Sequence, residues 1–293
     1  MKKTERLNLY QDVTNKVITQ MEKGVDSWQK CWSSTMPRNL SSQRDYRGIN
    51  TLLLWLQQND KGYAAGDWLS FKQAKDLGGN VKKGERGCRI VFFKKLDKEV
   101  ENKQGKTEVR QILMAKYSTV FNVAQIDNLD KEKLQEAQRE HQEAQQIIEG
   151  SGATIIGGQP SYSPKQDVIK MPEPASFNSL DEYYATTLHE LVHWSGNESR
   201  LDRSFENSKT WGDEAYAAEE LVAELGSAFL SAQCGIKGKL QHAEYLNNWV
   251  KVLKNDDKAI FRAASKAREA AEFINELVLE KQQENSKEQE MEV

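Results

Sequence analysis

The chain has 293 residues, of which 38% are hydrophobic and 29% are charged, and its formal net charge is −3. This size and composition predict a soluble globular protein with room for two hydrophobic cores. No apolar run approaches the length of a membrane span, and no hydrophobic segment follows the basic N-terminus, so neither a membrane protein nor a secreted one is expected. Three widely spaced cysteines suggest neither a disulfide framework nor a Cys-x-x-Cys metal site, and we expect a cytoplasmic protein.

The charge is distributed unevenly along the chain. Residues 1–130 contain 23 Lys and Arg against 15 Asp and Glu, a formal charge of +8, whereas the remaining residues carry −11. A basic first half favours a nucleic acid as its partner, while the acidic second half favours a different one.

Taken in chain order, residues 1–130 predict a small α+β domain with an antiparallel sheet. Apolar residues recur at helical spacing in two segments, a third short helix ends at glycines, and a strand leads into a polar hairpin tip. These predicted elements are 7–23, 51–59, 68–79, 88–93 and 98–107.

Cations and aromatic residues interleave in this first domain. Cationic side chains contact phosphates while aromatic faces stack on unpaired bases, which is the chemistry of single-strand binding. The alternative is that the aromatic residues are core and the lysines form a solvated face, and composition alone leaves both interpretations open. The candidate DNA-binding residues are Arg44, Tyr46, Arg47, Trp68, Lys82, Lys83 and Arg86.

The rest of the chain predicts a second domain behind a connecting helix. Residues 131–149 form a polar helix with a narrow apolar seam, and residues 150–280 form the domain. Within it, 153–156 and 166–171 flank a Gly/Pro/Ser turn and predict a hairpin. Residues 281–293 are almost all polar and predict a disordered tail.

The strongest chemical signal is His189-Glu190-Leu-Val-His193. Ser179 is placed to begin the surrounding helix and Gly196 to end it. Residues four apart on a helix share one face, so both histidines can ligate one metal ion while Glu190 takes a proton from bound water. The competing interpretation is a pair of hydrogen-bonded histidines on a half-buried helix.

The third metal ligand decides the class of zinc site. One large class places another histidine six residues after the second, but this chain has Ser199 there. A glutamate from the helix that follows is the alternative. Glu220 and Glu224 share a face of that helix, whereas Glu219 is rotated by roughly 100°. We predict Glu220 as the ligand and Glu224 as the acceptor for a histidine ring N–H.

Several blocks together resemble one protein family. Residues 46–50, 68–87 and 117–126 are similar to the N-terminal domain of ArdC-type antirestriction proteins, which is shared with plasmid primases. Residues 189–194 and 216–230, with Trp249–Asp256, resemble the zincin-like metallopeptidase domain of the same family.

The resemblance implies an α+β fold with two domains: a small α+β DNA-binding domain, and a mainly helical zincin-like metallopeptidase domain with a small sheet. It implies a conjugative-plasmid protein that binds single-stranded DNA and protects incoming DNA from the recipient's restriction system. The metal motif of the family carries over to His189, Glu190 and His193.

Three functions remain open at this point. The first is a peptidase with one Zn²⁺, or another divalent ion, per chain and an unidentified protein substrate such as a host restriction component. In it Glu190 is the base, Tyr216 donates to the oxyanion, and the strand at 166–171 is an edge that binds substrate. The second is a DNA-binding shield whose metal is structural, and the third is a DNA-priming accessory protein. The intact Glu190 favours the first.

Overall fold

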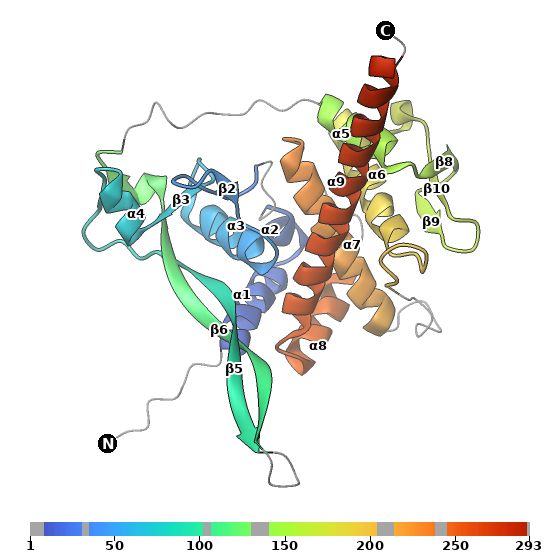
Figure 1. Ribbon diagram of the computed structural model, residues 1–293. Helices are drawn as coiled ribbons and strands as arrows, with labels where there is room; N and C mark the ends of the chain where they lie inside the picture. The colour runs from blue at the N-terminus through green and yellow to red at the C-terminus, as the bar shows by residue number, and fades with distance from the viewer. Residues whose placement is uncertain are drawn as a thin grey trace. The chain divides into compact units, whose positions relative to one another are not determined.

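The computed structural model describes residues 9–30, 35–101, 107–129, 141–203, 214–237 and 245–291 (Figure 1). The chain divides into two compact units. The sheet unit comprises residues 37–46 and 50–134, and the helical unit comprises residues 1–36, 47–49 and 135–293. The predicted α+β class with two domains is confirmed.

The described part of the sheet unit is built on a five-stranded sheet in the order β2-β1-β3-β6-β5. Only β1 and β3 pair in parallel, so the sheet is mixed rather than wholly antiparallel as predicted. Its strands are β1 (Arg38–Asn39), β2 (Arg44–Asp45), β3 (Asp67–Ser70), β5 (Cys88–Glu101) and β6 (Thr107–Asn122). The remaining elements are α3 (Ile49–Lys61), α4 (Phe71–Asp76), the 3₁₀ turn η1 (Val123–Gln125) and the small pair β4 (Asn80–Val81) and β7 (Ile126–Asp127).

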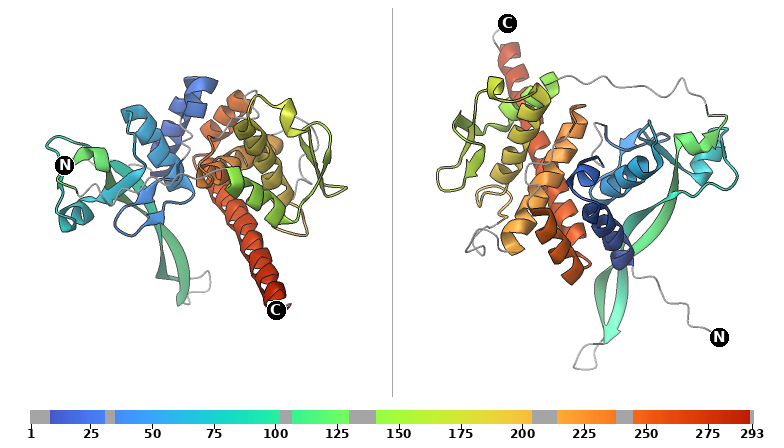
Figure 2. Two further views of the ribbon diagram at one scale, coloured as in Figure 1. Left: turned by 90° about the horizontal axis from the view of Figure 1, so that it is seen from above. Right: turned by 180° about the vertical axis from the view of Figure 1, so that it is seen from behind.

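Strands β5 and β6 continue beyond the sheet as a two-stranded ribbon (Figure 2). Strand β3 pairs only with residues 120–122 of β6, so the rest of the ribbon has no third strand among the described residues. On the edge of β5, Asn50 takes the place of a neighbouring strand. Its amide nitrogen donates to the Val91 carbonyl at 2.9 Å, and its oxygen accepts from the Val91 N–H at 2.8 Å. The backbone N–H and carbonyl of Val91, on the edge of the sheet, are thereby both hydrogen-bonded.

The helical unit consists of helices packed through apolar faces, together with a small sheet. Helix α7 packs against α6 and α9, and α5 packs against α9. Buried alanines recur along α9 at helical spacing, which lets its neighbours approach closely. The helices are α1 (Leu9–Glu22), α2 (Val25–Lys30), α5 (His141–Ser151), α6 (Leu180–Ser195), α7 (Glu214–Gln233), α8 (Leu246–Asn255) and α9 (Ala259–Met291), with the 3₁₀ turn η3 (Pro174–Ser176).

The small sheet has the order β8-β10-β9, formed by β8 (Thr154–Gly157), β9 (Ser161–Ser163) and β10 (Val168–Met171). Strand β10 pairs in parallel with β8 and antiparallel with β9. The prediction that 153–156 and 166–171 form a hairpin is therefore wrong, because the intervening strand β9 makes the hairpin instead. The same topology places 166–171 in the centre of this sheet, so the edge strand that contacts α6 is β9.

Two segments lie differently from the sequence-based boundaries. Helix α1, assigned to the first domain at 1–130, belongs to the helical unit, where Thr14 Oγ1 donates to the Asp257 carbonyl at 2.7 Å and Tyr10 packs edge-on against Phe261. Composition cannot reveal which core an amphipathic helix joins. Helix α9 continues to Met291 through the predicted disordered tail, because Glu, Gln and Lys are good helix formers. In the part of the chain that the structure describes, none of the helices has the length and apolar character of a membrane span.

Candidate metal centre

Helix α6 carries the His-Glu-x-x-His sequence in its buried C-terminal half. Ser179 caps its N-terminus as predicted, with Oγ accepting from the Glu182 N–H at 3.2 Å, and Gly196 follows its last turn. The next helix in the helical unit, α7, lies beside it, with Ser227 Oγ donating to the Ala185 carbonyl at 3.0 Å. This pairing brings glutamates of α7 to the two histidines.

His189, His193 and Glu220 form one buried cluster. The two histidine Nε2 atoms are 3.1 Å apart, and Glu220 Oε2 lies 3.4 Å from that of His189 and 3.6 Å from that of His193. With bonds of about 2.0–2.2 Å to a zinc-sized ion, tetrahedral ligand atoms lie about 3.3–3.6 Å apart. Both distances to Glu220 lie in this range and the distance between the histidines is slightly shorter, so the cluster and its donor set suit a divalent metal ion. The glutamate predicted as third ligand is the one that the structure brings to both histidines.

The charges of this cluster depend on one another. Burial lowers the pKa of His189. Burial also opposes protonation of His193, but hydrogen bonds with Glu219 and Glu220 outweigh it and raise the pKa of His193 to about 10. Burial would raise the pKa of Glu220, yet the two histidines hold it below its usual range. A bound cation would satisfy the same carboxylate in place of the imidazole proton.

A second layer of carboxylates faces the outer nitrogens of the two rings. Glu224 Oε2 lies 3.9 Å from His189 Nδ1, which is longer than a hydrogen bond, so its role as the acceptor for this ring stays a prediction. Glu219 Oε1 lies 3.5 Å from His193 Nδ1, although the sequence analysis placed this residue away from the site. Neighbouring positions on a helix diverge by about 100°. The planes of the two rings meet at 77°, and their outer nitrogens have different glutamates of α7 as neighbours.

Arg203 is a component of the site that the sequence analysis missed. Its side chain is buried, and its Nη2 lies 3.2 Å from Glu219 Oε1, while Nη1 donates to Ser195 Oγ at 3.0 Å. Nη2 also donates to the Val192 carbonyl near the end of α6. A Cβ on Gly196 would lie 2.9 Å from Nη2, so glycine leaves the space that the guanidinium occupies. The only local signal was an arginine shortly after a helix end, where cations bind the last carbonyls.

Two further predicted residues lie at the cluster. Glu190 is buried on α6 next to His189. Tyr216 is half-buried at the start of α7, and its hydroxyl interacts with Glu220. Burial, followed by the charge of Glu220, raises the pKa of Tyr216 well above its usual value, so the phenol stays protonated and able to donate.

The predicted DNA-binding residues are scattered by the fold. Trp68 is fully buried in the sheet unit, where it packs edge-on against Tyr63, so the prediction that its ring stacks on DNA is corrected: it is a core residue. Arg47 lies in the helical unit, where its Nη1 is 2.8 Å from Glu272 Oε1. Arg44 and Tyr46 line a cavity of the sheet unit.

The basic turn of the sheet unit is exposed. Lys82 Nζ donates to the Ala124 carbonyl at 2.9 Å and lies 3.8 Å from Asp127 Oδ1. Lys83 and Arg86 extend into solvent beside it. These three cationic residues lie close together in sequence. That they contact the phosphates of a DNA strand stays a prediction.

Two protein families match this chain. Residues 142–266 match the zincin-like metallopeptidase family MPTase-PolyVal, and residues 7–121 match the N-terminal domain of anti-restriction factor ArdC. A crystal structure of the antirestriction protein ArdC from plasmid R388, in a metal-free form, is 38% identical, covers 93% of this chain and 98% of its own, and superposes with a TM-score of 0.81. The Mn(II)-bound structure of that protein is 37% identical and covers 92% and 98%, with a TM-score of 0.75.

Other relatives are known from sequence. The protein y4eC of Sinorhizobium fredii is 37% identical over 284 residues, which is 92% of each chain. Two DNA primases named TraC from Escherichia coli are each 35% identical. This chain matches only 27% of the length of one and 19% of the other, so it corresponds to a part of those primases.

The ligand assignment predicts a ranking of metal affinities. Glu220→Ala removes an oxygen shared by both histidines and should abolish stoichiometric metal binding. Glu219→Ala and Glu224→Ala each remove a carboxylate behind a ring and should weaken affinity by about 10–100-fold. Metal content after dialysis and chelator competition measure all three. A larger loss for Glu219→Ala than for Glu220→Ala would show that the ligand is misassigned.

Arg203 should act on the metal through Glu219. Arg203→Met removes the guanidinium from the mostly buried Glu219 carboxylate and leaves His193 as its remaining partner, so we expect a loss of about 3 kcal/mol in the free energy of unfolding and a weaker metal site. Adding Glu219→Gln removes the carboxylate charge that has lost its guanidinium and should restore part of the stability. Thermal unfolding of the metal-free protein and chelator competition test this. Arg268→Met, which breaks a half-exposed ion pair on α9, is the control and should change neither quantity appreciably.

Proposed function

The chain belongs to the ArdC-type family of antirestriction proteins, and on that premise we propose that it binds single-stranded DNA and hydrolyses a peptide bond in a protein substrate at a zinc site. Together these activities would protect incoming plasmid DNA from the restriction system of the recipient cell. The proposal rests above all on the buried His189–His193–Glu220 cluster with the intact Glu190 beside it.

The donor set favours catalysis over a structural role for the metal. Structural zinc sites are closed by four protein ligands, whereas catalytic sites hold three and leave a position for water. Among the described residues, His189, His193 and Glu220 are the group whose atoms converge in this way. A divalent ion bound there would polarise a carbonyl and lower the pKa of bound water.

The protein's own side chains supply the proton transfers. Glu190 is held on α6 beside His189, where it would accept a proton from the attacking water and deliver it to the leaving amine. Tyr216 stays protonated at neutral pH and would donate a hydrogen bond to the developing oxyanion. Glu219 and Glu224 would orient the two imidazoles by accepting from their outer nitrogens.

Strand β9 is the candidate edge for an extended substrate. It is an edge of the small sheet and contacts α6, which carries the histidines. Its Tyr162 hydroxyl donates to Asp167 Oδ1 at 2.8 Å and accepts from Asn197 Nδ2 at 2.7 Å. Arg200 also pairs with Asp167, and its Cζ lies 3.9 Å from the centroid of the Trp194 ring. These contacts tie β9 to the end of the metal helix, so a peptide added to its edge would be held near the metal.

Glu190→Gln separates a peptidase from a shield. Gln keeps the size of the side chain but cannot accept the proton, so cleavage should fall by about 10²–10⁴-fold while metal content, melting temperature and DNA binding stay unchanged. The measurements are proteolysis of purified restriction-system subunits and plasmid transfer into restricting and non-restricting recipients. Glu198→Gln, an exposed change just after α6, is the matched control.

Loss of the metal from Glu190→Gln, or cleavage at the wild-type rate, would contradict the proposed mechanism. Full protection of plasmid DNA by Glu190→Gln, with no substrate cleaved by the wild type, would favour the DNA-binding shield instead.

DNA binding should depend on the basic turn of the sheet unit. Neutralising Lys82, Lys83 and Arg86 to Gln removes up to three phosphate contacts, and each contact with a single strand contributes about 0.7 to the slope of log affinity against log salt. Fluorescence anisotropy of the full chain at several salt concentrations measures that slope. The control neutralises three exposed lysines of the helical unit, Lys237, Lys251 and Lys266. Equal slopes for both triple variants would contradict the assignment.

A further inference from the structure

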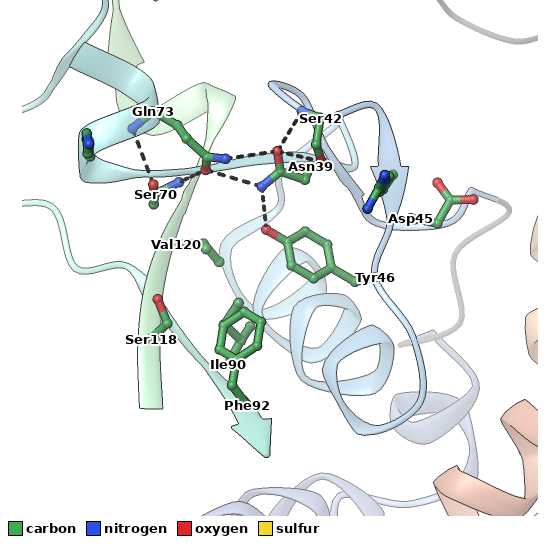
Figure 3. Close-up of a pocket in the computed structure, with 12 residues that line it drawn as sticks. Asn39, Ser42, Asp45, Tyr46, Ser70, Gln73, Ile90, Phe92, Ser118 and Val120 are labelled. Carbon is green, nitrogen blue, oxygen red and sulfur yellow. Dashed lines mark hydrogen bonds between the residues drawn. The ribbon is translucent and has the colours of Figure 1, made fainter. Parts of the chain in front are cut away.

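The sheet unit contains a cavity of about 420 Å³ that the metal site and the basic turn do not involve (Figure 3). It lies where β1 and β2, the start of α4, and strands β5 and β6 come together. Its volume is in the range of small-molecule sites, which begin at about 300 Å³. The chemistry of its walls is divided between a polar end and an apolar floor.

The polar end is a pair of side-chain amides held in place by their neighbours. Asn39 Nδ2 donates to Gln73 Oε1 at 3.2 Å, and Gln73 Nε2 donates to Asn39 Oδ1 at 3.3 Å. The backbone N–H of Ser42 fixes the Asn39 oxygen at 3.0 Å, and that of Ser70 fixes the Gln73 oxygen at 2.9 Å. The amides are therefore oriented before any ligand arrives.

Two donors of this end remain available. Asn39 Nδ2 donates to the Tyr46 hydroxyl at 3.1 Å, so the hydroxyl hydrogen of Tyr46 can point to a ligand. Burial raises the pKa of Tyr46, which keeps that hydrogen in place at neutral pH. One amide hydrogen of Gln73 is used by Asn39, and the other has no acceptor among the residues that the structure describes.

The floor and the mouth are apolar and aromatic. Ile90 and Val120 are buried beneath the cavity, and the ring of Tyr46 lies at its side with the hydroxyl toward Asn39 (Figure 3). Phe92 also lines the cavity, yet its side chain is 52% exposed. A phenylalanine on a strand this open to water is available to cover a flat ligand.

The rim of the cavity carries two cationic side chains. Arg44 on β2 and Lys72 on α4 both line the cavity and are exposed, with Asp45 as the accompanying anion. The site thus combines aromatic faces, fixed hydrogen-bonding groups and positive charge at its mouth.

We propose that this cavity binds one unpaired nucleobase of a DNA strand, with Phe92 and Tyr46 against the base and Arg44 and Lys72 at the adjoining phosphates. Stacking on aromatic rings and hydrogen bonding to exposed base edges are how proteins bind unpaired bases. A duplex cannot use the cavity without unstacking, so the site selects single strands. This inference rests on the proposed single-strand binding and assigns it a contact point.

Phe92→Ala tests the base contact, and Phe93→Ala is its matched control. Consecutive strand residues face opposite sides, so Phe93, 41% exposed, lies away from the cavity that Phe92 lines. Full-length protein is titrated against a fluorescent thymidine 12-mer and against a 12-mer of abasic residues. We expect Phe92→Ala to weaken binding of the thymidine strand about tenfold, Phe93→Ala to leave it within twofold, and neither to change binding of the abasic strand.

A second pair of variants tests the rim without touching the cavity floor. Lys72→Gln should reduce the salt slope by about 0.7, whereas Lys75→Gln on the same helix, outside the cavity lining, should not. Affinity that rises steeply from dTMP to the 12-mer supports a strand as the ligand, while equal affinity would overturn that assignment in favour of a free nucleotide.

Equal effects of Phe92→Ala and Phe93→Ala, or an equal loss on thymidine and abasic strands, would overturn the base site while leaving single-strand binding intact. Absence of binding by the wild-type protein to both strands would instead overturn the proposed DNA-binding function itself, so the two failures are distinguishable.

Discussion

The close approach of α6 and α7 is the constraint on which the metal centre depends. A Cβ on Gly226 would lie 2.9 Å from Val192 Cγ2, so a glycine at this point lets the helices pack close enough for Glu220 to reach both histidines. The approach also buries the side chains of Glu220 and Glu224 almost completely. Buried carboxylates are costly unless they are compensated, so this packing is stable only with positive charge between the helices. The close packing of α6 and α7 therefore requires a positive charge beside these two glutamates.

The two histidines are supported in different ways. Behind His193, Glu219 is itself held by the buried guanidinium of Arg203, which in turn bonds to the end of α6. Behind His189, Glu224 lies at a longer distance in a fully buried position. The Arg203 contacts link His193 to the loop that follows α6, and the same loop anchors β9 through Asn197. The part of the helical unit proposed to hold the substrate is thus connected to one ligand through a chain of polar contacts, whereas the other ligand is fixed by the core.

What the sequence predicted correctly was local. His189 and His193 share one face of α6 and Ser179 caps it, because residues on one helix keep fixed relative positions. The same reasoning selected Glu220, which lies beside both histidines, and its role as the metal ligand stays a prediction. The errors concern pairings between distant segments. Nothing near Trp68 in sequence shows that its ring is fully buried. No periodicity shows that β10 pairs in parallel with β8 on one side and antiparallel with β9 on the other. Arg203 was missed for the same reason, since its partner is sixteen residues away on the next helix.

The two candidate sites differ in the sign of the charges that they carry: the metal centre has buried carboxylates, and the cavity of the sheet unit has cations at its rim. The metal centre concentrates buried carboxylates within a half of the chain that carries an excess of acidic residues, so a phosphate backbone is repelled from it. The cavity of the sheet unit is lined by neutral amides and, at its rim, by Arg44, Lys72 and Asp45, which suits the proposed nucleic-acid strand better than a metal ion. The charge asymmetry along the sequence therefore agrees with the two activities that we propose, because the basic residues belong to the first half and the buried carboxylates to the second.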